Sequence, residues 1–179
     1  MMSAVLFTGC AAVLVLAALL GFFGIAHVRL SGPDAIERDG LAPGVRAPTW
    51  SIADSAGAVH TSPPVRPLQL VLFADHSLKS FPSVVDGLRE LLAEGGPLEV
   101  VLMLRQPNPV AEPLLRELGL GSIAVLTGSS ALYADYNVRV GPFAIFVDSD
   151  GLVRASSLVN YSWQVAKLRQ LAGLPVAVG

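Results

Sequence analysis

The stretch that decides the fold is "LVLFADHSLKSF", residues 70–81, in which an apolar run passes into a short polar loop. The full apolar run covers residues 68–73 and is typical of a strand buried on both faces. After the loop, Ser80 is the predicted cap of a helix whose first turn tolerates Pro82 and which ends at "EGGP", near residue 94. A buried strand that leads through a polar loop to a helix start is a frequent position for chemistry in α/β proteins.

The same order then repeats along the chain. Residues 98–104 form a second buried strand, and "NPVAEPLLRELGL" predicts a helix with Asn108 as its cap and Pro109 at its first position. Strands that alternate with helices predict a largely parallel sheet with helices on its faces. A short strand over 122–126 and a short helix over 129–136 follow.

The two ends of this region differ from its middle. Residues 50–60 predict a strand, a turn and a returning strand, while three prolines in "SPPVRP" make the next segment a loop. Residues 143–148 and 152–159, separated by an "SDG" turn, predict an antiparallel hairpin, and a last helix runs from 161 to 171. The fold class is therefore α/β, with a mixed sheet and flanking helices.

Hydrophobic residues make up 53% of the 179-residue chain, and their excess is concentrated near the start. Residues 4–26 carry no charge and exceed the roughly 20 residues that a helix needs to cross a bilayer. No Lys or Arg precedes the run and no small-x-small cleavage site follows it, so an uncleaved single-pass transmembrane anchor is predicted. We expect a linker over 27–40 and a folded domain over 41–175.

Charge excludes one class of partner and says little about membrane sidedness. The net charge is −2 and no basic stripe occurs, so nucleic acid is not an expected partner. Arg29 and Arg38 follow the predicted anchor, which by the positive-inside rule weakly favours a cytoplasmic domain. Acidic residues are interleaved with these two arginines, so the rule does not determine on which side of the membrane the domain lies.

Three segments carry a resemblance to a known family. "GLAPGVRAPTW" (40–50), "LVLFADHSLKSF" (70–81) and "VGPFAIFVDSDGLVRASSLVN" (140–160) occur in an order and spacing that resemble the thioredoxin-like fold. They are similar in particular to the membrane-anchored thiol-disulfide oxidoreductases that include the methylamine-utilisation accessory family. The resemblance covers residues 40–172 and implies a thioredoxin-like sandwich, with Pro142 in the place of that family's cis-proline and the domain outside the cytoplasm.

The chain departs from this family at the residues that do its chemistry. The family uses C-x-x-C at the start of the first long helix, where a thiol pKa is lowered. By the resemblance the two cysteines fall on Leu78 and Phe81, or in the alternative register on Ser77 and Ser80. The only cysteine is Cys10, inside the predicted anchor. We therefore expect neither disulfide exchange nor thiol peroxidase activity.

A loop of this shape without a nucleophile is better suited to binding than to catalysis. In thioredoxin-like proteins the residue before the cis-proline presents its backbone to an extended peptide, which needs no cysteine. We predict no catalytic residue, no metal and no cofactor, and a partner protein at the membrane that the chain helps to mature or assemble. The predicted binding residues are Ser77, Leu78, Lys79, Ser80, Phe81, Gly141 and Pro142.

Two alternatives stay open at this stage. The first is an enzyme that acts on a small ligand through Asp75, His76 or Lys79, although no G-x-S-x-G elbow accompanies the adjacent Asp75, His76 and Ser77. The second is a structural subunit whose anchor packs against other membrane helices.

Overall fold

The computed structural model describes residues 39–173. The predicted anchor over 4–26 and most of the predicted linker lie outside the described residues, so both stay predictions, as do the domain boundaries. Within residues 39–173, no helix is both long enough and apolar enough to span a membrane.

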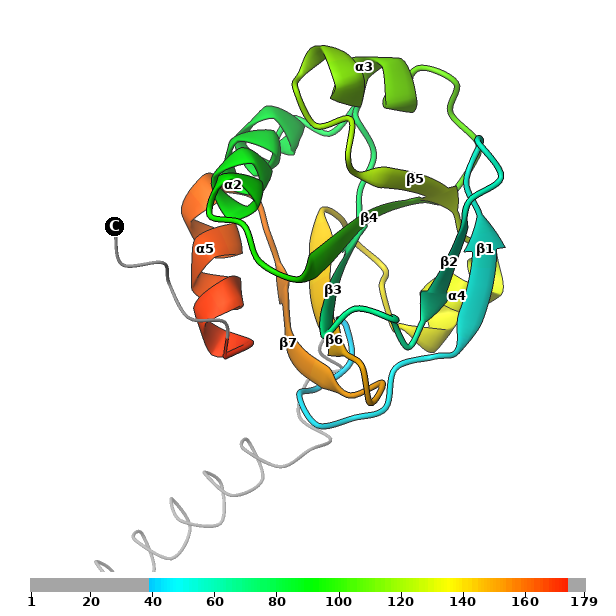
Figure 1. Ribbon diagram of the computed structural model, residues 1–179, viewed down its shortest axis with the longest axis vertical. Helices are drawn as coiled ribbons and strands as arrows, with labels where there is room; N and C mark the ends of the chain where they lie inside the picture. Colours follow the sequence, from blue (N-terminus) through cyan, green and yellow to red (C-terminus); the bar gives the residue numbers. More distant parts are fainter. Residues whose placement is uncertain (1–38, 174–179) are drawn as a thin grey trace, which may run out of the picture. The chain divides into compact units, whose positions relative to one another are not determined.

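The core of the domain is a mixed five-stranded sheet in the order β5-β4-β3-β6-β7 (Figure 1). Its strands are β3 (Leu68–Phe73), β4 (Leu98–Leu104), β5 (Ala124–Thr127), β6 (Phe143–Asp148) and β7 (Val153–Leu158). β3, β4 and β5 run parallel, while β6 is antiparallel to β3 and to β7. The predicted mixed sheet and the C-terminal hairpin are confirmed.

Alternate residues of the central strand β3 feed two apolar layers. Leu70 and Leu72 pack with the helices α2 (Phe81–Ala93), α3 (Ala111–Glu117) and α5 (Ser162–Leu171). Val71 and Phe73 face the opposite layer, which contains α4 (Ser130–Asp135) and the start of β1 (Trp50–Ala53). In Figure 1, α2 and α5 lie side by side on one face of the sheet and α4 lies on the other.

Helix α2 and helix α5 approach each other closely at one residue. A Cβ built on Gly87 would lie 2.8 Å from the backbone oxygen of Ser162, so only glycine fits at this crossing. The backbone N–H of Ser162 also donates to Ser83 Oγ at 3.2 Å. These contacts fix the start of α5 against the middle of α2.

The start of α2 agrees with the sequence prediction except for its capping bond, whereas the start of α3 differs. Ser80 occupies the N-cap position of α2, but its side chain makes no capping hydrogen bond. Helix α3 begins at Ala111 instead of Pro109, because Asn108 forms a separate turn: its Oδ1 accepts from Val110 N at 3.0 Å and its carbonyl accepts from Ala111 N at 3.2 Å. Neither Ser80 nor Asn108 therefore caps its helix through a side-chain hydrogen bond, although both predicted helices are present.

The N-terminal hairpin is held against the sheet by a histidine between two carboxylates. It pairs β1 with β2 (Val59–Ser62). His60 Nδ1 lies 2.8 Å from Glu99 Oε1 of β4, and its Nε2 lies 3.2 Å from Asp54 Oδ2. Burial alone lowers the pKa of His60, but the hydrogen bonds to Glu99 and Asp54 outweigh burial, so the pKa is raised above 6.5.

The His60 contacts predict a pH-dependent stability. Since the folded-state pKa is raised, the contribution of protonated His60 is complete below pH 6.5 and is lost as pH rises through the folded-state pKa. We expect the melting temperature of the full chain to exceed that of His60→Gln by a few degrees near pH 5.5, and by less near pH 9. Thermal melts followed by circular dichroism measure this. A difference that stays constant with pH would contradict it.

Candidate functional site

The loop between β3 and α2 is a defined turn that starts at Asp75. Asp75 Oδ1 accepts from the backbone N–H of Ser77 at 2.9 Å, and Phe81 N donates to the carbonyl of Leu78 at 2.9 Å. The pKa of Asp75 is lowered, first by the backbone N–H of Ser77, then by the Ser77 side chain and the charge of His76. The loop therefore presents an ionised carboxylate at the end of β3.

The adjacent Asp75, His76 and Ser77 are not arranged as a catalytic triad. His76 Nδ1 lies 2.8 Å from Asn108 Nδ2 and 3.3 Å from Asp75 Oδ1. No hydrogen bond within residues 39–173 joins the Ser77 hydroxyl to the imidazole of His76. A serine nucleophile needs a base within hydrogen-bond reach, and His76 does not serve Ser77 in this way. This geometry therefore does not support an enzyme in which His76 activates Ser77 for hydrolysis.

The second predicted half of the site lies directly beside this loop. The Gly141–Pro142 peptide bond is cis, and it precedes Phe143, which pairs with Phe73 at the end of β3. A Cβ built on Gly141 would lie 3.0 Å from the carbonyl oxygen of Phe73 and 3.8 Å from Leu78 Cδ1. The structure thus brings Leu78 and Gly141 together across a narrow gap.

A cleft of about 220 Å³ opens between these two segments. Of the predicted binding residues, only Leu78 and Gly141 line it. Phe81 is 4% exposed and belongs to the core, while Ser77 and Lys79 are exposed outside the lining. Ser80, half-buried, and Pro142, buried, do not line it either. The remaining lining residues are Phe73, Ala74, Asp75, Arg105, Tyr133, Val138, Arg139 and Val140.

A larger hollow of about 470 Å³ lies between the β1–β2 hairpin and the loop before α3. Neither Leu78 nor Gly141 lines it. The smaller cleft is therefore the candidate site, because it alone of the two combines the loop after β3 with the loop before β6.

Arg105 and Tyr133 are functional candidates that the sequence did not reveal. The guanidinium carbon of Arg105 lies 4.2 Å from the centre of the Tyr133 ring, a cation–π contact. Tyr133 is itself fixed, since its hydroxyl donates to the carbonyl of Met103 at 2.8 Å and its ring meets Phe73 edge-on at 4.9 Å. Burial raises the pKa of Tyr133 to about 12, so the ring is a neutral platform. One signal was available: Arg105 directly follows β4, at the same sheet edge as Asp75.

Comparison with known proteins identifies the fold. No protein-family model and no curated protein sequence matches the chain. Among solved structures, it is similar to a thio-disulfide isomerase from Thermus thermophilus, with a TM-score of 0.58 at 20% identity, covering 75% of this chain and 99% of that one.

Two further similar structures are of the same kind. A peroxiredoxin-like protein from Aquifex aeolicus has a TM-score of 0.58 at 12% identity, covering 75% of this chain and 90% of that one. The thioredoxin domain of a thiol-disulfide oxidoreductase from Bacteroides vulgatus has a TM-score of 0.54 at 16% identity, covering 71% and 97%. The chain has a thioredoxin-like fold.

Within this thioredoxin-like fold, the loop before α2 contains no cysteine in either possible register. Leu78, half-buried, lines the cleft, whereas Phe81, at the first position of α2, is buried beneath it. Ser77 and Ser80 lie on the outer side of the turn and neither is buried. The strand, loop and helix therefore have a thioredoxin-like arrangement, and the loop presents apolar and hydroxyl side chains and no thiol.

Proposed function

We propose that this chain is a membrane-anchored thioredoxin-like protein that carries out no thiol-disulfide exchange and binds an extended segment of a partner protein. The observation that carries the proposal is the cleft between Leu78 and Gly141, with Arg105 at its rim. The role that fits best is that of an accessory, which holds a partner during its maturation or assembly at the membrane, on the outer side.

Backbone groups beside the cleft support an extended ligand. Gly141 is exposed, and no hydrogen bond recorded within residues 39–173 uses its N–H or C=O. Unpaired backbone groups at the rim of a groove can accept and donate main-chain hydrogen bonds to a peptide in β conformation. Because Gly141 has no side chain, such a peptide can approach closely, and Leu78 provides an apolar wall on the other side.

Charge at the rim indicates which peptide fits. Arg105 is exposed and has no ion pair within the described part of the chain, while Tyr133 holds its guanidinium in place. Arg139 differs, because its Nε lies 2.9 Å from Asp39 Oδ1. The cleft also contains the ionised Asp75 carboxylate, so it favours a segment in which an apolar side chain is flanked by polar or charged groups that pair with Arg105 and Asp75.

Site-specific photocrosslinking tests this proposal. A photoreactive amino acid at Val140, which lines the cleft and is 50% exposed, should crosslink the full chain in its native membrane to a discrete partner protein. We expect Arg105→Glu or Leu78→Asp to reduce the adduct about tenfold, because each adds a negative charge to a cleft that already contains the Asp75 carboxylate. The adduct is measured by immunoblotting and mass spectrometry.

The matched control uses Val65, which is 95% exposed and does not line the cleft. The same photoreactive residue at this position should give no such adduct. If both positions crosslink the same protein equally, or if neither cleft variant lowers the adduct at Val140, the cleft is not the binding site. The structural-subunit alternative would then be favoured.

A further inference from the structure

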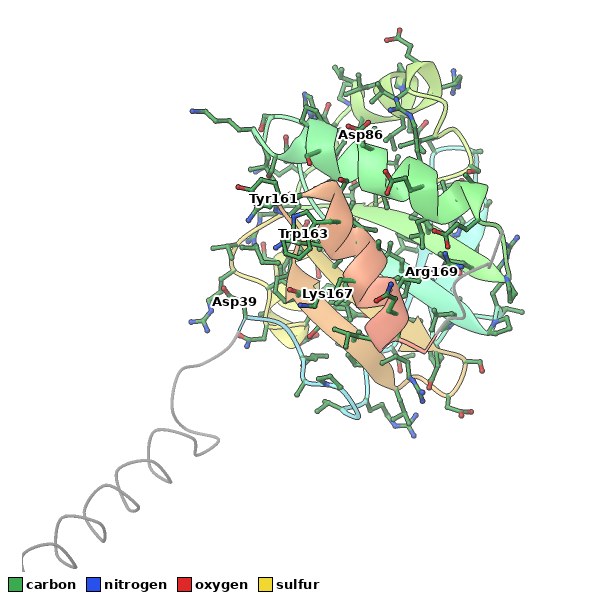
Figure 2. The ribbon with its side chains drawn as sticks, turned by 90° about the vertical axis from the view of Figure 1, so that its left-hand side faces the viewer. Asp39, Asp86, Tyr161, Trp163, Lys167 and Arg169 are labelled. Carbon is green, nitrogen blue, oxygen red and sulfur yellow. The ribbon has the colours of Figure 1, made fainter. Side chains whose placement is uncertain are left out.

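Helix α5 exposes a row of large side chains that the domain itself does not cover (Figure 2). Tyr161 and Trp163 are each 58% exposed, and their rings stack with centroids 6.4 Å apart and planes 8° apart. Lys167 is exposed and Leu171 is 66% exposed. Trp163, Lys167 and Leu171 are four residues apart, so they share one side of the helix. We call Tyr161, Trp163, Lys167 and Leu171 the α5 face.

Helix α5 packs on the core through its other side, so the α5 face is not exposed for lack of a core contact. Val165 and Leu168, on the other side of the helix, are each 2% exposed and pack in the layer that contains α2. Single exposed apolar residues are ordinary in soluble domains, but a stacked aromatic pair in line with a leucine points to a contact with something else.

The charge carried by helix α5 itself is positive. Helix α5 contains no Asp or Glu, and its two basic residues are Lys167 and Arg169. Arg169 is buried and paired with Glu94, whereas Lys167 has no ion pair within residues 39–173. The two carboxylates labelled in Figure 2 are each paired with an arginine, Asp39 with Arg139 and Asp86 with Arg89. The α5 face therefore offers aromatic, aliphatic and cationic groups together.

That combination matches the water–membrane boundary. Tyr and Trp are enriched there because one end of each ring is apolar and the other can hydrogen-bond, and Lys reaches lipid phosphates. A helix with such a face lies in the plane of the interface with its apolar side chains about 5–10 Å into the headgroup and acyl boundary.

The start of the described domain lies at the end of the sheet from which α5 begins, although Gly40 packs on Phe143 in the layer opposite α5. Gly40 N donates to the carbonyl of Asn137 at 2.7 Å, and a Cβ on Gly40 would collide with the ring of Phe143. Phe143 pairs with Leu158, the last residue of β7, and Tyr161 follows shortly after. Figure 2 shows Asp39, Tyr161 and Lys167 on one side of the domain.

The segment between the uncharged run and the domain is short, and this limits which surfaces the α5 face can reach. Only residues 27–38 separate the uncharged run over 4–26 from Asp39. At no more than about 3.5 Å per residue, this segment reaches about 40 Å. If the run is the predicted anchor, its lipid bilayer is the surface that the α5 face meets at high local concentration.

We propose that the α5 face docks on the surface of the bilayer that holds the anchor. Trp163 and Leu171 enter the boundary region, Tyr161 stacks beside Trp163, and Lys167 contacts lipid phosphate. Docking fixes the orientation of the domain on the membrane. The inference rests on the membrane anchor of the proposed function but concerns a different surface from the cleft, so binding at the cleft and docking of the α5 face can fail separately.

Tryptophan quenching by brominated lipid tests the proposal directly. The chain has two tryptophans, Trp50 and Trp163, and Trp50 is only 8% exposed. The segment over 1–38 contains none, so insertion of the anchor alone produces no quenching. The full chain is placed at one copy per lipid nanodisc, with bromine near the top of the acyl chains. We expect Trp163 emission to fall by about half relative to unbrominated discs.

Trp163→Phe is the matched control, because it leaves Trp50 as the only fluorophore and should show no quenching. Lys167→Gln should be quenched less than wild type in discs with anionic lipid. If wild-type emission is the same in brominated and unbrominated discs, the proposal is overturned, and a protein partner or a second copy becomes the occupant of the face. Failure of the chain to enter discs overturns it as well.

Discussion

Wild-type protein is expected to leave the reduction of insulin by dithiothreitol at the rate seen in buffer alone. Exchange begins with a thiolate, and the loop over 77–81 contains none. The start of α2 can lower the pKa of a thiol, but there is no thiol there to activate. The measurement is the turbidity of reduced insulin with the full chain in detergent. Turnover comparable to that of a thioredoxin would contradict the proposed absence of exchange.

Two controls make this result informative. Cys10→Ser removes the only thiol of the chain and should behave as wild type. A double substitution, Leu78→Cys with Phe81→Cys, places thiols at the first helical position and three residues before it, where the helix N-terminus favours the thiolate. We expect this variant, or Ser77→Cys with Ser80→Cys, to exceed the buffer rate. If neither does, the loop itself has lost the geometry for exchange.

The fold was largely predictable because its signals are local. The six apolar residues of β3, the turn between β6 and β7, and the glycines after α2 each act over a few residues, and all three predictions are confirmed. The start of α3 was not predictable from the Asn108-Pro109 pattern. That pattern fits both a helix cap and an isolated turn, and the contact of Asn108 with His76 lies 32 residues away in sequence.

Only those parts of the candidate site that the resemblance to a known family covers could be predicted from the sequence. Leu78 and Gly141 could be placed through the resemblance, but Arg105 and Tyr133 meet only because β4 and α4 end near one edge of the sheet. The interior position of Phe81 was also hidden. A residue at the first turn of a helix faces either the core or the solvent, and sequence spacing alone did not decide which.

Phe81 and Leu78 should differ sharply in their contribution to stability, although they lie only three residues apart. Phe81 is 4% exposed and packs in the layer formed by α2, α3 and α5. Replacing a buried Phe by Ala removes its contacts and leaves a cavity, so Phe81→Ala should cost about 3–5 kcal/mol of unfolding free energy. Leu78 is half-buried and touches only the margin of this layer, so Leu78→Ala should cost about 1 kcal/mol.

Chemical denaturation of the two variants, followed by near-ultraviolet circular dichroism, measures this difference. Equal losses would mean that Phe81 is not a core residue in solution, and the cleft would then include both side chains. A larger loss of unfolding free energy in Phe81→Ala than in Leu78→Ala would separate stability from binding at these two positions. Substitution at position 81 therefore changes the core, whereas substitution at position 78 changes the wall of the cleft. Leu78 is therefore the position at which substitution tests binding without unfolding the domain.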